Sequence, residues 1–140
     1  MRFEKLTTKF QQALAEAQSL ANISDHGQIE PVHLLKALLS LDPDEISKFL
    51  ILSGMRDLGF KAFDEAMEKI PKISSSSNEP VISRNLNSLF NWVEKKANQL
   101  GDKFISSDLF LLALDHDKSG VKEILVNSGL DFKKLEDILM

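Results

Sequence analysis

The chain of 140 residues contains no cysteine and no tyrosine, one tryptophan, six glycines and four prolines. The absence of cysteine excludes a disulfide framework, a thiolate nucleophile and a cysteine-based zinc site, and it suits a reducing compartment such as the cytoplasm. No apolar run approaches the roughly 18 residues of a membrane-spanning helix, and the opening MRFEKLTTKF is too charged for a secretory signal. We therefore expect a soluble, cytoplasmic protein that does not bind a membrane.

Charge and glycine placement argue against two further classes of function. The formal net charge of −4 opposes binding to a nucleic-acid backbone, and the lysine pairs at 95–96 and 133–134 are isolated within helical patterns. The glycines are scattered, so the GxxxxGK[ST] cradle that holds a nucleotide phosphate is missing. We expect no nucleic-acid partner and no ATP hydrolysis by this chain.

The residues that could carry catalysis do not form a recognisable set. His26, His33 and His116 lack the spacing that places two imidazoles on one helical face, and we interpret them as surface or boundary residues. The 21 acidic residues are expected on solvated faces and at helix caps. Ser53 and Ser128 lie at expected helix ends, and no GxSxG turn surrounds either. Catalysis, a cofactor and a metal site are therefore not expected.

A hydrophobic pattern that occurs twice is the most informative feature of the chain. A shift of 76 positions lays apolar residues on apolar residues in two consecutive segments, and a shift of 75 does so in a third. Matching pairs include Leu6/Ile82, Phe10/Leu86, Leu14/Phe90, Ile29/Ile105, Leu34/Phe110 and Ile46/Val121. Two copies are too few for a solenoid, which needs about three, so the copies are expected to pack around one shared core.

The predicted fold is all-α: one compact domain at 1–140, built from two pseudo-twofold repeats of about four helices each. Repeat one covers 1–71, a serine-rich connector covers 72–80, and repeat two covers 81–140. No alternating run is long enough to predict a strand. The connector has no apolar periodicity, so its segment 74–78 is expected to be the most mobile and the first cut by a protease.

Polar and glycine residues mark the expected helix ends. The first helix is expected to start at Thr7 or Thr8, with Thr8 and Gln11 as a capping box. Three further residues are expected to cap the N-termini of helices: Glu30 before Pro31, Ser83 at the position equivalent to Thr7, and Ser106. Gly54 and Gly129 are expected to end helices.

Three separated segments resemble the amino-terminal domain of ClpB-type disaggregases, within the Clp family of AAA+ unfoldases. They are LTTKFQQALAEAQSLA, IEPVHLLKALL and GDKFISSDLFLLAL, in the family's order and with the serine-rich joint between the halves. The opening run favours ClpB over the ClpA and ClpC relatives. The resemblance implies an all-helical pseudo-twofold domain on flexible linkers above ATPase rings, so that ATP would belong to modules outside this chain.

The resemblance also implies an apolar groove between the two halves that recruits polypeptide. Residue by residue, it assigns substrate binding to Thr7, Phe90, Asp102, Asp108 and Leu109. Asp108 stands where glutamate is usual and Phe90 where leucine is usual, so the shorter acid would weaken one polar contact and the phenylalanine would enlarge the apolar wall. Thr7 and Asp108 could equally be helix caps.

Three functions remain open from the sequence. The first is a non-catalytic domain that binds unfolded or aggregated polypeptide weakly for an ATP-dependent disaggregase, since apolar burial is non-directional. The second is a docking domain for an adaptor or co-chaperone protein, and the third is a lid that regulates the attached ATPase. The isolated domain is expected to be a monomer, and the parent chain a ring oligomer.

Overall fold

A computed structural model describes residues 2–57, 60–73 and 79–140. Its first half contains α1 (Thr8–Ile23), β1 (Gln28–Ile29), α2 (Pro31–Leu41), α3 (Pro43–Leu52) and α4 (Phe60–Glu68). Its second half contains β2 (Val81–Ile82), α5 (Arg84–Leu100), α6 (Ser107–Ala113), α7 (Val121–Asn127) and α8 (Phe132–Leu139). Helices dominate the described ranges, and the predicted all-α class with four helices in each repeat is confirmed.

Two backbone contacts join the repeats, and the residues of one contact are equivalent to those of the other under the 76-residue shift. Leu6 forms a parallel bridge with Ile105, and Ile29 pairs with Ile82 in the short parallel sheet of β1 and β2. The backbone N–H of Thr7 donates to the carbonyl of Ile105 at 2.9 Å. These bridges correct the expectation that the chain has no strand, because two-residue strands are too short to give an alternating pattern.

Helix caps repeat with the same shift. The Thr7 hydroxyl accepts from the backbone N–H of Phe10 at 3.2 Å, and the Ser83 hydroxyl accepts from that of Leu86 at 3.1 Å. Thr7 is thus the N-cap of α1, and it is one of the two residues at which the sequence predicts the helix to start. The predicted box of Thr8 with Gln11 is wrong, because the Gln11 amide donates instead to the carbonyl of Leu6 at 2.9 Å.

The other two predicted caps differ in their side-chain contacts. Glu30 precedes α2 as expected, and its backbone N–H donates to Nδ1 of His33 at 2.8 Å. Ser106 precedes α6, but its side chain makes no capping hydrogen bond.

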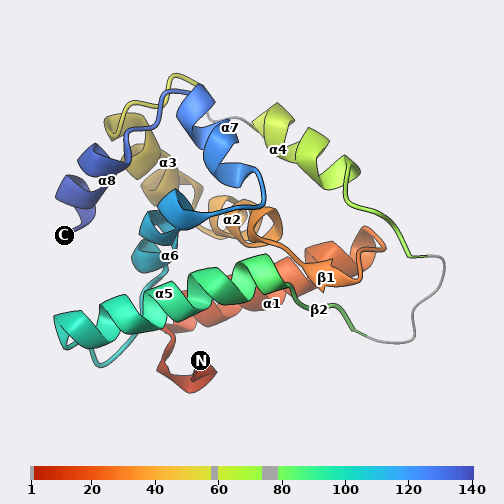
Figure 1. The fold of residues 1–140 in the computed structure, drawn as a ribbon, viewed down its shortest axis with the longest axis horizontal. Coiled ribbons are helices and arrows are strands. Elements are labelled where there is room, and N and C mark those ends of the chain that lie inside the picture. The colour runs from red at the N-terminus through yellow and green to blue at the C-terminus, as the bar shows by residue number, and fades with distance from the viewer. Residues whose placement is uncertain (1, 58–59, 74–78) are drawn as a thin grey trace.

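The core lies around α2 and α6, which are central in Figure 1 and bury most of their residues on every side. Three phenylalanines from different helices meet there. Phe10 of α1 packs against Phe90 of α5, with ring centroids 6.1 Å apart, and against Phe110 of α6, at 6.4 Å. In Figure 1, α3, α4, α7 and α8 lie on one side of this centre, and α1 and α5 lie on the other.

A close approach between the ends of α3 and α7 requires glycine in both repeats. Gly54 and Gly129 have φ values of +109° and +105°, which residues with a side chain rarely adopt. A Cβ on Gly54 would lie 2.6 Å from the carbonyl oxygen of Gly129, and the converse distance is 2.5 Å. These glycines therefore end their helices, as predicted, and also let the two repeats touch.

Two expectations from the sequence concern the connector between the repeats and membrane-spanning helices. The predicted mobile segment 74–78 lies outside the described residues, so its mobility and the domain boundaries stay predictions. None of the helices in the described ranges combines the length and the apolar character that a bilayer crossing requires.

Candidate functional site

Three of the five predicted site residues meet at one shallow pocket. Asp102 comes from the loop after α5, whereas Asp108 and Leu109 come from the first turn of α6. The pocket encloses about 270 Å³ and is completed by the ends of α5 and α8. Its lining also includes Leu100, Ser106, Leu112, Leu139 and Met140. We call this surface, together with Phe104 of the same loop, the α6 face.

Thr7 lies beside the α6 face rather than in its pocket. Its backbone is bonded to Ile105, three residues before Asp108, and the side chain is half-buried. The hydroxyl oxygen already accepts the capping hydrogen bond from Phe10. A hydroxyl has a second lone pair and its own proton, so Thr7 can cap α1 and still contact a ligand.

The α6 face has an acidic edge. Burial raises the pKa of the Asp108 carboxyl, the negative charges of Glu45 and Asp42 raise it further, and the positive charge of Lys9 opposes them. Lys9 forms an ion pair with Asp42 and another with Glu45 at 3.3 Å. One lysine thus faces three carboxylates, and Asp102 adds an exposed fourth nearby. This edge favours ligands that carry positive charge.

The structure corrects the expectation that Phe90 forms an accessible wall. Its side chain has no exposed surface, and the rings of Phe10 and Phe3 both make edge contacts with it, each with a centroid 6.1 Å away. Phe3, which is 41% exposed, covers Phe90 and separates it from solvent. Phe90 is therefore a core residue in this structure.

Leu109 stands between core and surface. It is only 4% exposed, yet it lines the floor of the α6 pocket. We expect Leu109→Ala to lower the free energy of unfolding by about 2 kcal/mol, the lower end for a buried leucine, because the shallow pocket beside it can relax. Urea denaturation checks this value, and a client titration on the same protein checks the binding role. Destabilisation with unchanged client binding would remove Leu109 from the site.

Sequence reasoning missed the most exposed apolar residues of this face. Phe104 is 63% exposed, Met140 51% and Leu100 43%. Leu100 and Met140 line the same pocket, and Phe104 belongs to the loop that supplies Asp102 and Ser106 to it. Exposed apolar side chains grouped in this way are typical of a binding surface. The signal was present in GDKFISSDLF, where Phe104 lies outside any helical stripe, but the sequence does not reveal that the end of α8 lies beside that loop.

The histidines differ from the surface residues that we expected. His26 and His33 are buried, with Nδ1 of His26 2.8 Å from Nε2 of His33, and only His116 is exposed. Burial, followed by the charge of His26, lowers the pKa of His33 to about 4. The described residues hold no group of three or more histidine, aspartate or glutamate side chains arranged to bind a metal ion.

With this geometry in place, comparison with known proteins identifies the class. Residues 5–128 match the model of the Clp repeat (R) N-terminal domain, and the chain belongs to that family. Among curated proteins it is similar to the chaperone protein ClpB of Pseudomonas putida, with 38% identity over 140 residues, and to that of Vibrio cholerae, with 36%. Each alignment covers 99% of this chain but 16% of the relative. The predicted family is thereby confirmed.

Solved structures share the fold. The N-terminal domain of Hsp104 from Candida albicans matches with a TM-score of 0.81 and 22% identity, over 96% of this chain and 89% of that one. The N-terminal domain of the ClpV1 ATPase from an Escherichia coli type VI secretion system matches with a TM-score of 0.73 and 22% identity, over 96% and 83% of the two chains. At this level of identity the likeness extends to the fold alone.

Proposed function

We propose that this domain recruits unfolded or aggregated polypeptide for an ATP-dependent disaggregase, with the α6 face as its binding surface. The observation that carries the proposal is the pocket that unites Asp102, Asp108 and Leu109 beside exposed Leu100 and Met140. The domain itself is non-catalytic in this proposal, and ATP hydrolysis belongs to modules beyond the 16% of the ClpB chaperones that the chain matches.

The chemistry of the α6 face suits clients without a common sequence. Apolar burial yields roughly 25 cal/mol per Å² and needs no donor geometry, so any exposed apolar segment can contribute. The acidic edge adds a preference for segments that also carry lysine or arginine. Because the pocket is small and a captured chain loses entropy when ordered, binding should be weak and reversible.

The test is an NMR titration of the domain with a soluble, permanently unfolded protein. We expect amide shifts to gather in the loop 101–106 and the first turn of α6. The variant Phe104→Ser should weaken binding about tenfold, because it removes one large apolar side chain from the contact. Its free energy of unfolding should change by less than about 0.5 kcal/mol, as for other exposed sites.

A matched control comes from α7, which contributes no residue to the pocket of the α6 face. Val126 is 46% exposed, and Val126→Ser makes the same kind of apolar-to-polar change away from the α6 face. Equal losses in the Phe104 and Val126 variants would mean that clients bind wherever apolar surface is exposed, and the proposed face would be rejected.

Docking of a folded adaptor is the second candidate function. One structural neighbour is described as a peptide from the SciI protein of an E. coli type VI secretion system, and another concerns ClpV with the TssB-TssC sheath and the HsiE protein. Those names favour protein partners for this fold. A tight one-to-one complex with a single folded protein, without binding of unfolded chains, would favour docking, and an absence of both kinds of binding would favour the regulatory lid.

A further inference from the structure

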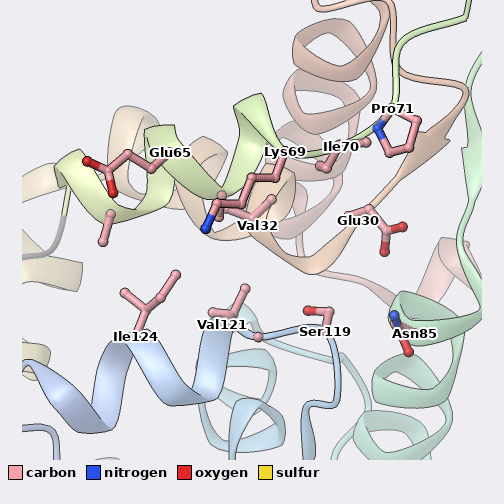
Figure 2. Close-up of a pocket in the computed structure, with 13 residues that line it drawn as sticks. Glu30, Val32, Glu65, Lys69, Ile70, Pro71, Asn85, Ser119, Val121 and Ile124 are labelled. Carbon is pink, nitrogen blue, oxygen red and sulfur yellow. The ribbon is translucent and has the colours of Figure 1, made fainter.

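A second pocket lies between α4 and α7. The pseudo-twofold relation between the repeats places it at the position equivalent to the α6 face. The pocket encloses about 550 Å³, and its walls come from the start of α2, α4, the loop before α7 and α7 itself (Figure 2). The 76-residue shift converts Glu30 and Val32 of this pocket into Ser106 and Asp108 of the α6 face. The two pockets are therefore equivalent places in the two repeats, with different chemistry.

The pocket occupies the space between α4 and α7, which contact each other only over a small area. α4 packs on α2, where Lys36 forms an ion pair with Asp64, and it touches α7 less extensively than α8 touches α3. Apolar side chains form the middle of the resulting space: Val32 from α2, Ala66 from α4, and Val121 and Ile124 from α7. Figure 2 shows Val121 and Ile124 facing the α4 side across the gap.

A polar group closes one end of this apolar space. Glu30 and Asn85 lie near each other at that end, with Ser119 beside them (Figure 2). The Oε1 atom of Glu30 is buried and has no hydrogen-bond partner. A buried carboxylate oxygen without a donor costs free energy, and a donor supplied by a ligand would relieve that cost.

We propose that this pocket receives a lysine or arginine side chain of a bound polypeptide, whose cationic head donates to Oε1 of Glu30. The aliphatic stem of such a side chain would lie along Val32, Val121 and Ile124, as the stems of lysine and arginine commonly cover apolar surface. The lining holds two carboxylates, Glu30 and Glu65, and one cation, Lys69, so its charge complements a cation rather than an anion. This inference deepens the proposed function by giving the recruited chain a second contact.

The experiment uses peptides too short to reach both pockets, so its result is independent of binding at the α6 face. Ac-Gly-Arg-Gly-NH₂ and Ac-Gly-Lys-Gly-NH₂ are titrated while the amide signals of Asn85, Ser119 and Gly120 are followed by NMR. Neutral counterparts with citrulline for arginine and norleucine for lysine keep the shape and remove the charge. We expect saturable shifts with at least one cationic peptide, and binding of its neutral counterpart about tenfold weaker.

Charge variants give the sign of the interaction. Glu30→Gln keeps the length of the side chain and should weaken cationic peptides about tenfold, whereas Glu68→Gln, on an exposed part of α4 outside the pocket, should not change binding. Lys69→Gln removes a competing cation and should leave binding unchanged or stronger. Ala66→Leu narrows the apolar middle of the pocket, where the stem of a lysine or arginine would lie, without altering Glu30, and should weaken binding.

Several results would overturn the proposal. They are equal binding of citrulline and arginine peptides, unchanged binding by a folded Glu30→Gln domain, or weaker binding by Lys69→Gln, which would indicate an anion site. If Glu30→Gln disturbs α2, the Ala66→Leu variant still decides, because unchanged binding by that variant would place the peptide elsewhere. Failure of this pocket would leave the Phe104 titration unaffected, so the two proposals fail separately.

Discussion

Replacing Phe90 by alanine is expected to lower the free energy of unfolding by about 3–5 kcal/mol, the range for a buried phenylalanine. The side chain has no exposed surface and makes edge contacts with Phe3 and Phe10, each at 6.1 Å between centroids. Such aromatic pairs add stability beyond their buried area. A loss of this size is a large share of the roughly 5–15 kcal/mol that stabilise a typical domain. Urea denaturation of the isolated domain measures it.

Phe104→Ala is the matched control, because the same side chain is removed from a position that is 63% exposed. It should change the unfolding free energy by less than about 0.5 kcal/mol, as at other surface sites. If Phe90→Ala does not fold, Phe90→Leu should still be measurable with a loss of about 1 kcal/mol. A small loss at Phe90 together with weakened client binding would restore it to the groove that the sequence resemblance implies.

The contrast between these phenylalanines illustrates what a sequence pattern can predict. The 76-residue shift matches Phe90 with Leu14 and so identifies both as members of an apolar helical stripe. The stripe does not reveal which of its members another segment covers. In the structure Phe3 covers Phe90, whereas Leu14 at the equivalent place is only partly buried and lines an open pocket with Val81.

The repeat pattern predicted the fold well because its physical cause is local. Helix caps such as Thr7 and Ser83 act within one turn, and apolar stripes of period 3.6 are visible without tertiary contacts. The bridges from Leu6 to Ile105 and from Ile29 to Ile82 are tertiary, and two residues carry too little pattern to predict a strand. They became recognisable only when the equivalent positions were seen to pair across the repeats.

The candidate site was predictable only in part. Asp102, Asp108 and Leu109 are close in sequence, so a loop and one helical turn bring them together. Met140 completes the same pocket from the end of α8, and its place depends on how that helix packs on α3 and α6. Likewise, the single-sequence view of scattered histidines could not reveal that β1 and its preceding turn bring His26 onto His33.

This histidine pair makes the stability of the domain dependent on pH. The backbone N–H of Glu30 donates to Nδ1 of His33, so the proton of a neutral His33 lies on Nε2 and can be donated to Nδ1 of His26. Both rings are buried, so protonation of either one places a positive charge in a region that is nearly inaccessible to solvent. Burial lowers the pKa of His26 as well, with the charge of Lys72 acting in the same direction, and Asp25 and Glu30 opposing.

The sign of the effect follows from the pKa of His33 in the folded chain, which is about 4, whereas the ordinary pKa of a histidine is 6.5. Above pH 6.5 the ring is neutral in both states, and its full contribution to stability is present. As the pH falls toward 4, the unfolded chain binds a proton that the folded chain excludes, so stability is lost across this window. The total loss is about 3 kcal/mol, of which about 2 kcal/mol falls between pH 7 and pH 5.

Urea denaturation at intervals from pH 7 to pH 5 tests this prediction in the range where most carboxylates remain ionised. The wild type and the control His116→Gln, which alters the exposed histidine, should lose stability in parallel. His33→Gln should be less stable at pH 7 but should show a flatter dependence, because one of the two buried groups whose pKa is lowered in the folded state is gone and only His26 remains. A pH dependence that persists in His33→Gln and disappears in His116→Gln would assign the effect to the wrong histidine and refute the buried-pair argument.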